Sequence, residues 1–145
     1  MVDNSNNNNS RIAVIGVGGW GKNHARVLGE LGVLGAVCDF DAARAKEISA
    51  KHGATPYSSV DDMLAQERLD ACLVCTPTRT HSAVAKKVID RGLHAFVEKP
   101  LSFSSQECDE MTELARKKRV TLTCGYIERF NPAVSETKKM IADKK

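Results

Sequence analysis

The sequence predicts an α/β fold in which a doubly wound parallel sheet of about six strands carries helices on both faces. Short apolar runs alternate with amphipathic helical stretches along the chain. The first apolar run, Ile12 to Ile15, leads into glycines at G-x-G-x-x-G spacing, namely Gly16, Gly18 and Gly21. Asp39 ends the second apolar run, about twenty residues past the glycines. Together these observations indicate a Rossmann-type dinucleotide-binding domain.

The glycine turn and the helix expected over residues 22–31 form the predicted phosphate site. Gly16 allows the tight turn, Gly18 lets a pyrophosphate approach the backbone, and Gly21 allows the helix to pack closely on the strand. The phosphates would then lie on the N–H groups at the start of the helix. Gly19 completes the predicted turn.

Trp20 belongs to the same turn. Its ring could shield the cofactor while its N–H group meets phosphate, and a hydrophobic packing role is an equal alternative. His24, in the first turns of the helix, is expected to pack or cap there.

Asp39 follows the strand expected over residues 34–38 and is the predicted acceptor for the adenosine ribose hydroxyls. A hydrogen bond to a charged group contributes about 1.5 to 3 kcal/mol, and the same charge repels a 2′-phosphate. The sequence therefore favours NAD over NADP. Arg44 could stack on the adenine, the alternative being a solvated helix arginine.

The other elements follow from periodicity and from cap residues. Asp41 is the expected N-cap of the second helix and Gly53 its stop, while Ser104 or Ser105 caps a later helix. Pro77 ends a buried strand because proline cannot donate to a sheet ladder. The predicted elements are helix 41–52, strand 54–57, helix 60–66, strand 69–75, helix 80–91, strand 94–97, helix 105–118, strand 120–124 and helix 133–142.

Composition narrows the class of protein. A chain of 145 residues with a net charge of +3 forms one domain, with room for a fragment of another. Much of the basic excess lies in the last residues and not in a stripe crossed by aromatics, so we expect no nucleic-acid partner. No apolar run reaches the length of a membrane span, and the Asn-rich residues 1–10 are expected to be a disordered polar tail without the apolar core of a signal peptide.

Five cysteines, an odd number, fit a reducing cytoplasm better than secretion. Cys72 and Cys75 form a C-x-x-C, for which a redox or zinc site is the alternative. Residues three apart in a strand point to opposite faces, and no second Cys/His pair has ligand spacing. We therefore expect core thiols and no metal.

In doubly wound sheets, ligands lie at the carboxyl ends of the strands, where the strand order reverses. This rule nominates the glycine turn, Asp39, residues 76–78 and residues 98–100 without reference to any family.

The chain from Ile12 onward resembles the N-terminal cofactor domain of the Gfo/Idh/MocA family, that is, the glucose-fructose oxidoreductase, inositol dehydrogenase and rhizopine-catabolism group. The motifs that carry the resemblance are, in order, G-V-G-G-W-G-K-N-H, D-F-D from Asp39, T-P-T-R-T-H from Thr76, E-K-P-L from Glu98 and G-Y-I-E-R-F-N-P from Gly125. The last motif is most similar to the branch that oxidises UDP-activated amino sugars, such as UDP-N-acetylglucosamine 3-dehydrogenases.

The resemblance implies an NAD-dependent oxidoreductase in which Lys99 lies close to the nicotinamide and the substrate hydroxyl and acts in catalysis. It implies that the Lys99–Pro100 bond is cis and that Tyr126, Arg129 and Asn131 lie on the substrate side. The cofactor-binding residues implied by the turn and the resemblance together are Gly16, Gly18, Gly19, Trp20, Gly21, Asp39, Arg44, Thr76, Pro77, Thr78, His81, Glu98, Lys99 and Pro100.

The resemblance also implies a division of the chain. After the tail, residues 11–130 would form the NAD-binding domain and residues 131–145 the start of a linker or helix toward a missing C-terminal substrate domain. Hydride would pass from a sugar or sugar-nucleotide hydroxyl to NAD. Without the second domain we expect no full turnover; the full-length form would be a cytoplasmic homo-oligomer. Two alternatives are a non-catalytic NAD-binding sensor or partner module, and a methyltransferase that binds S-adenosylmethionine.

Overall fold

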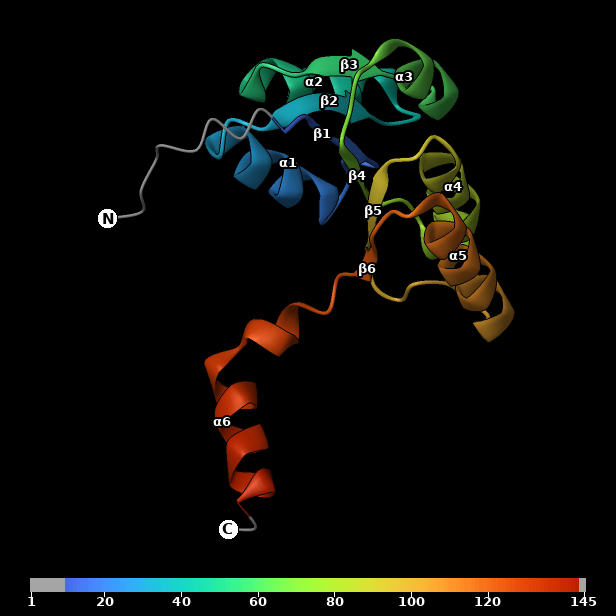
Figure 1. Ribbon diagram of the computed structural model, residues 1–145. Helices are drawn as coiled ribbons and strands as arrows, with labels where there is room; N and C mark the ends of the chain where they lie inside the picture. Colours follow the sequence, from blue (N-terminus) through green and yellow to red (C-terminus); the bar gives the residue numbers. More distant parts are fainter. Residues whose placement is uncertain (1–9, 144–145) are drawn as a thin grey trace.

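The computed structural model describes residues 10–143, so residues 1–9 of the expected tail and residues 144–145 lie outside the described part. One six-stranded sheet runs in the order β3-β2-β1-β4-β5-β6, and every neighbouring pair of strands is parallel (Figure 1). The elements are β1 (Ile12–Ile15), α1 (Gly21–Glu30), β2 (Leu34–Cys38), α2 (Ala42–His52), β3 (Thr55–Tyr57), α3 (Val60–Gln66), β4 (Ala71–Val74), α4 (Thr78–Asp90), β5 (His94–Val97), α5 (Ser105–Lys118), β6 (Leu122–Cys124), the 3-10 helix η1 (Ile127–Phe130) and α6 (Pro132–Ala142). The strand order reverses between β1 and β4, which confirms the doubly wound fold and creates a ligand crevice there.

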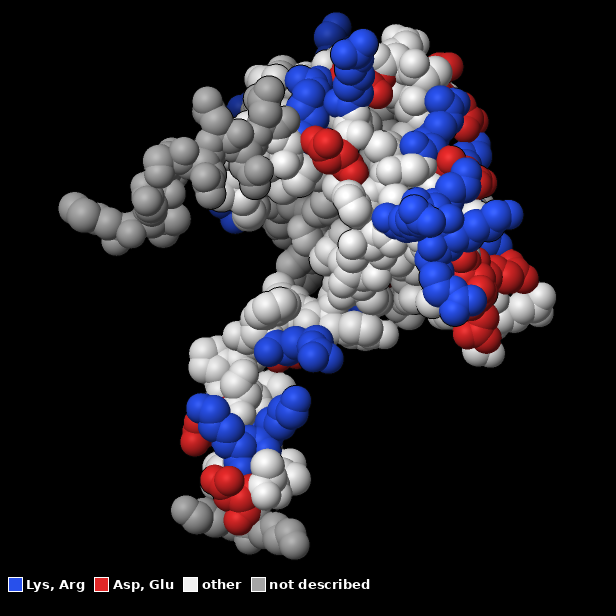
Figure 2. All heavy atoms as spheres, viewed as in Figure 1, with Lys and Arg blue, Asp and Glu red and all other residues white. Residues whose placement is uncertain are grey.

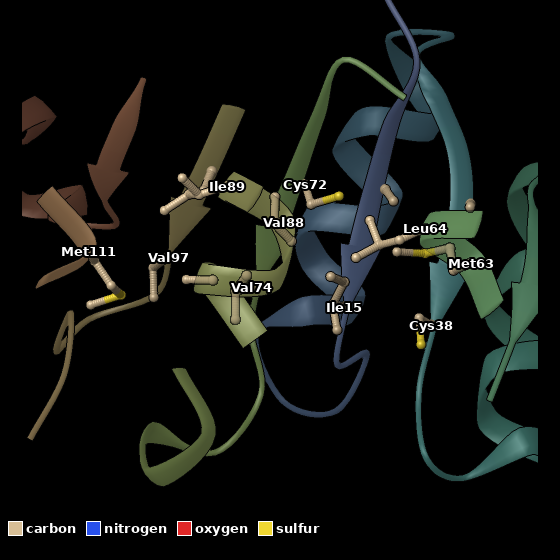
Figure 3. Packing of buried hydrophobic residues seen from close by; sticks show 14 of the residues in the cluster. Ile15, Cys38, Met63, Leu64, Cys72, Val74, Val88, Ile89, Val97 and Met111 are labelled. Atoms are coloured by element: carbon tan, nitrogen blue, oxygen red, sulfur yellow. The ribbon is translucent and has the colours of Figure 1, made fainter. Parts of the chain in front are cut away.

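Alternating strand residues divide the core into two layers. Val14 and Val37 pack with residues of α1 and α2 on one face of the sheet. Ile15 and Val74 point to the other face, where Met63 of α3 and residues of α4 and α5 cover them (Figure 3). Each such side chain contributes about 1.5 to 3 kcal/mol when fully buried. The helices thus cover both faces of the sheet, and its carboxyl edge is left to the loops.

Most predicted boundaries agree with the structure, and the caps act as expected. The Asp41 side chain accepts hydrogen bonds from two main-chain N–H groups of α2, and Gly53 ends that helix with φ of 70°. Strand β6 starts at Leu122 and not at residue 120, because the Val120 N–H donates to the Ala115 carbonyl and so completes the end of α5. Helix α4 begins at Thr78, directly after Pro77, two residues earlier than predicted.

Charged side chains are mixed over the surface. Figure 2 shows basic groups over α4 and α5 with acidic groups among them, and pairs such as Lys87 with Asp61 (2.6 Å) and Lys118 with Asp90 (3.3 Å) join neighbouring elements. Arg116 at the end of α5 pairs with Glu113. The basic last turn of α5, Arg116 to Lys118, is therefore solvated and partly paired.

Helix α6 projects from the body of the domain (Figure 1). Every residue of α6 is exposed, and the closest packing is with η1. Ile141, at 72% exposure, is among the apolar side chains left uncovered. Within residues 10–143, no helix has the length and apolar character that crossing a bilayer requires.

Glu67 joins the start of β1 to the end of α3 and gives the stability of the domain a defined pH dependence. Arg11 Nη2 donates to Glu67 Oε2 at 2.7 Å, and the Tyr57 hydroxyl donates to Oε1 at 3.0 Å. Burial raises the pKa of Glu67, but these hydrogen bonds and the charge of Arg11 outweigh it, so the pKa falls below its usual 4.5. Because the folded-state pKa is depressed, the stabilisation is present above the unfolded value and is lost as pH falls through the folded value.

We therefore expect the free energy of unfolding to decline as pH falls below about 4.5, and Glu67→Gln to remove part of that decline. Urea unfolding at a series of pH values measures it. Glu47→Gln is the matched control, because Glu47 also has a lowered pKa but pairs with Lys51 on the open surface. An equal decline in the chain and in Glu67→Gln would contradict the assignment.

Candidate dinucleotide-binding site

A cavity of about 780 Å³ opens at the carboxyl edge of the sheet, where the strand order reverses. This is a typical size for a small-molecule site. The loops that follow β1, β2, β4 and β5 all contribute to its walls. It is lined by Ile15, Gly16, Gly18, Gly19, Trp20, Cys38, Asp39, Phe40, Arg44, Ser58, Val60, Cys75, Thr76, Pro77, Thr78, Arg79, Thr80, His81, Val84, Glu98 and Lys99.

The glycines divide into those that the fold needs and those that leave space for a ligand. Gly16 has φ of 85°, so the predicted tight turn is present. A Cβ placed on Gly21 would lie 1.8 Å from the Gly16 carbonyl oxygen, because α1 packs directly on the turn. A Cβ on Gly18 or Gly19 would meet nothing within 4 Å. The backbone at Gly18 and Gly19 is therefore open to a ligand.

The start of α1 suits an anion. Trp20 stands at the N-cap position, and within residues 10–143 no side chain caps the first turn. The first N–H groups of a helix carry a partial positive charge. Those of Lys22 and Asn23 already donate to the Gly18 and Trp20 carbonyls, at 3.3 and 2.9 Å. With Gly18 and Gly19 open beside them, the residues fit the pyrophosphate of a dinucleotide.

Asp39 is buried and accepts hydrogen bonds from three other residues. Its side chain is 3% exposed. Oδ2 accepts from the Val17 N–H at 2.9 Å, and Oδ1 accepts from the Asp41 N–H at 3.0 Å. Arg44 Nη1 donates to Oδ1 at 3.2 Å and to Oδ2 at 3.3 Å. The predicted ribose acceptor thus also joins the glycine turn to the start of α2.

Arg44 and Phe40 line the cavity beside Asp39. Phe40 is 86% exposed, and the guanidinium carbon of Arg44 lies 5.9 Å from the centre of its ring. Arg44 Nη2 also pairs with Asp41 Oδ2 at 3.1 Å. Phe40 was not among the residues expected at the site, although its place directly after Asp39, at the end of β2, indicates a position at the ligand edge of the sheet.

Glu98 and His24 join α1 to the turn that follows β5. His24 Nε2 lies 2.7 Å from Glu98 Oε1, and the His24 ring meets the edge of Phe96 at a centroid distance of 5.4 Å. Glu98 Oε2 accepts from the Lys99 N–H at 3.1 Å. His24, expected to pack or cap, therefore packs on Phe96 and also connects the phosphate helix to the turn at the end of β5. Lys99 is exposed at the rim of the cavity, and its bond to Pro100 is cis, as the resemblance implies.

His81 lies inside the wall of the cavity. It is 2% exposed, with Nδ1 2.8 Å from the Pro100 carbonyl oxygen and Nε2 2.8 Å from the Thr76 carbonyl oxygen. Carbonyl oxygens only accept, and either ring nitrogen of an imidazole can carry the donated proton, so the ring can donate to either carbonyl. His81 therefore ties the loop after β4 to the turn after β5. Thr76 and Thr80 pair through their hydroxyls at 2.8 Å beside it.

The residues expected on the substrate side are not brought to this cavity. Tyr126 and Arg129 line a separate hollow of about 540 Å³ with residues of α5 and β6. Asn131 is the N-cap of α6, its Oδ1 accepting from the Ala133 N–H at 2.9 Å. Their predicted role in substrate contact remains a prediction.

The C-x-x-C cysteines lie on opposite faces of the sheet. Cys72 belongs to the core layer under α3, α4 and α5, and Cys75 packs against the layer of α1 and α2. Burial raises the pKa of each thiol to about 12, and the charge of Glu98 adds to the effect at Cys75. Both are therefore thiols at neutral pH, unsuited to thiolate chemistry. Across residues 10–143, no three His, Cys, Asp or Glu side chains gather as metal ligands would.

The strand order, the open glycine turn and the buried acidic residue at the end of β2 define this protein as a dinucleotide-binding domain. Residues 10–126 match the model of the GFO_IDH_MocA family, described as an oxidoreductase family with an NAD-binding Rossmann fold. The chain belongs to this family, and NAD is its cofactor.

Similar proteins include the UDP-N-acetylglucosamine 3-dehydrogenase of Acidithiobacillus ferrooxidans, 37% identical over 86% of this chain and 39% of the relative. The NAD(+)-dependent scyllo-inositol 2-dehydrogenase of Bacillus subtilis is 34% identical over 90% of this chain and 40% of the relative. The WlbA dehydrogenase of Bordetella pertussis, solved with NADH and UDP-GlcNAcA, superimposes with a TM-score of 0.87 at 30% identity, covering 92% of this chain and 42% of that one. The chain thus spans about two fifths of the length of these relatives.

Because a Cβ on Gly18 would point into open space, we expect Gly18→Ala to leave folding intact and to weaken NAD binding about a hundredfold, or about 2.7 kcal/mol. The added methyl group would occupy the place where the pyrophosphate meets the backbone. Calorimetric titration with NAD measures the affinity, and urea unfolding verifies the fold. Unchanged affinity in a folded variant would show that the pyrophosphate does not bind at this turn.

Proposed function

We propose that this chain is the cofactor domain of an NAD-dependent dehydrogenase that oxidises a hydroxyl group of a sugar or sugar nucleotide. The observation that carries the proposal is that Lys99 and Gly18 line one cavity. The glycine turn would hold the pyrophosphate, and the turn after β5 would meet the nicotinamide end. When bound, NAD supplies the acceptor for a hydride from the carbon that carries the hydroxyl.

Lys99 is the proposed catalytic residue. Its exposed side chain at the cavity rim can hold the substrate oxygen by a hydrogen bond and take part in moving the hydroxyl proton. Glu98 positions this turn by accepting from the Lys99 N–H. His24 in turn fixes the Glu98 carboxylate from α1.

UDP-activated amino sugars are the proposed substrates. The A. ferrooxidans relative is a UDP-N-acetylglucosamine 3-dehydrogenase, and the B. pertussis structure contains UDP-GlcNAcA. Because this chain spans about two fifths of such relatives, we propose that a second domain supplies the substrate contacts. In this proposal residues 131–145 lead to that domain, the complete protein is a cytoplasmic homo-oligomer, and the isolated chain lacks turnover.

A chimera tests the proposal. Joining this chain to the remaining three fifths of the A. ferrooxidans relative should give NADH formation that depends on both NAD and UDP-N-acetylglucosamine, while the chain alone should bind NADH without turnover. NADH absorbance follows the reaction, and a Gly18→Ala chimera controls for activity from another source. A folded chimera that binds NADH but transfers no hydride would favour the non-catalytic NAD-binding module. Displacement of NAD by S-adenosylmethionine would favour a methyltransferase.

A further inference from the structure

We propose that Arg44 controls the choice between NAD and NADP by covering, in the free protein, the acceptor positions of Asp39 that the adenosine ribose needs. The inference rests on the NAD assignment, which the proposed function shares, and does not depend on the sugar substrate. It concerns only side chains at the carboxyl end of β2 and the first turn of α2.

The acceptor capacity of Asp39 is filled. A carboxylate offers about four lone-pair positions. The N–H groups of Val17 and Asp41 take one on each oxygen, at 2.9 and 3.0 Å. Arg44 Nη1 takes the others, at 3.2 and 3.3 Å. The two main-chain bonds belong to the fold, so ribose hydroxyls can reach Asp39 only if Arg44 moves.

Arg44 is able to move. Its side chain is 38% exposed, whereas that of Asp39 is 3% exposed. Its second anchor, Asp41 Oδ2 at 3.1 Å, belongs to a carboxylate that is itself 38% exposed. Exposed ion pairs of this kind are weak. The exposed ring of Phe40, 5.9 Å from the guanidinium carbon, leaves a second surface for the displaced side chain or for the adenine.

The two cofactors would meet this arrangement differently. NAD offers two neutral ribose hydroxyls, which must compete with Arg44 for Asp39. NADP carries a 2′-phosphate, which the guanidinium can bind through paired hydrogen bonds. Asp39 and Asp41 leave a net charge of −1 around Arg44, so NADP remains the weaker ligand. Arg44 therefore narrows the preference for NAD that Asp39 creates.

Calorimetric titration of the chain with NAD and with NADP tests this. For Arg44→Ala we expect NAD to bind about threefold more tightly, because Asp39 is freed, and NADP to bind about tenfold more weakly, because its phosphate loses its partner. The ratio of the two dissociation constants should then rise about thirtyfold. Urea unfolding establishes that the variant is folded.

Asp41→Asn is a second variant, for which we expect the opposite effect on NADP affinity. Asparagine caps a helix as well as aspartate does, so the bonds from Ala43 N and Arg44 N at 3.1 and 3.2 Å can be kept while one anchor charge is removed. NADP should then bind about fivefold more tightly. Lys51→Ala, which removes a paired cation from the last turn of the same helix, should change neither affinity.

Equal weakening of both cofactors in Arg44→Ala would overturn the proposal and make Arg44 a general adenine contact. Unchanged affinities in Arg44→Ala would also overturn the proposal, because Arg44 would then be a solvated arginine with no part in cofactor binding. An unaltered chain that binds neither cofactor would instead overturn the NAD assignment itself, and with it the proposed function. A chimera that binds NAD with the expected Arg44 response but oxidises no sugar would overturn only the proposed function.

Discussion

Replacing Lys99 by alanine should reduce kcat of the chimera for UDP-N-acetylglucosamine oxidation about a thousandfold, which is within the range for loss of a group that moves or holds the reacting proton. The side chain is exposed at the cavity rim, so its removal leaves no cavity in the core. The Glu98 carboxylate can still accept from the main-chain N–H at position 99. NADH affinity should therefore change little. Steady-state rates of NADH formation and direct titration with NADH separate the two effects.

Lys46→Ala is the matched control for this experiment. Lys46 is an exposed lysine on α2 and does not line the cavity, so its loss should leave kcat unchanged. Retention of most of the rate in Lys99→Ala would show that another group handles the hydroxyl proton. In that case the turn after β5 would serve cofactor binding alone.

Gly21→Ala should destabilise the domain by about 3 kcal/mol or more, at the upper end of the cost of overpacking. The new Cβ would lie 1.8 Å from the Gly16 carbonyl oxygen and 3.2 Å from the Cys75 Cβ. The first of these is main chain, so α1 would have to move away from β1 and β4. In an exposed helix the same substitution would be stabilising by about 1 kcal/mol. Urea unfolding should therefore show a lower free energy of unfolding, whereas helix propensity alone would raise it.

Gly19→Ala is the control from the same turn, since a Cβ there meets nothing within 4 Å. Its free energy of unfolding should stay within about 0.5 kcal/mol of the parent chain. A Gly21→Ala variant as stable as the parent would mean that α1 does not pack on the glycine turn as the structure has it.

Local patterns in the sequence were sufficient to predict the fold. The apolar run before Gly16 forms β1, the spacing to Asp39 spans one complete strand-helix-strand unit, and Asp41 and Gly53 bound α2 as their capping preferences require. Such signals depend on neighbours along the chain. The position of the cavity was predictable too, because parallel strands bring their carboxyl ends to one edge.

Contacts between distant residues were not predictable in the same way. His24 meets Glu98 across 74 positions of sequence, and no local pattern encodes that pair. His81 was expected among the cofactor-binding residues, and no local pattern showed that the fold encloses it between two carbonyl groups. Arg44 was expected to stack on adenine, and its bonds to Asp39 became evident only from the side-chain geometry.

Trp20 gives this domain its own optical probe. It is the sole tryptophan of the sequence, it is 56% exposed, and it lines the cavity beside the glycine turn. Indole emission overlaps the absorption of reduced nicotinamide, so a bound NADH should quench the tryptophan fluorescence by energy transfer. A single emission signal would then report occupancy of this cavity without any attached label.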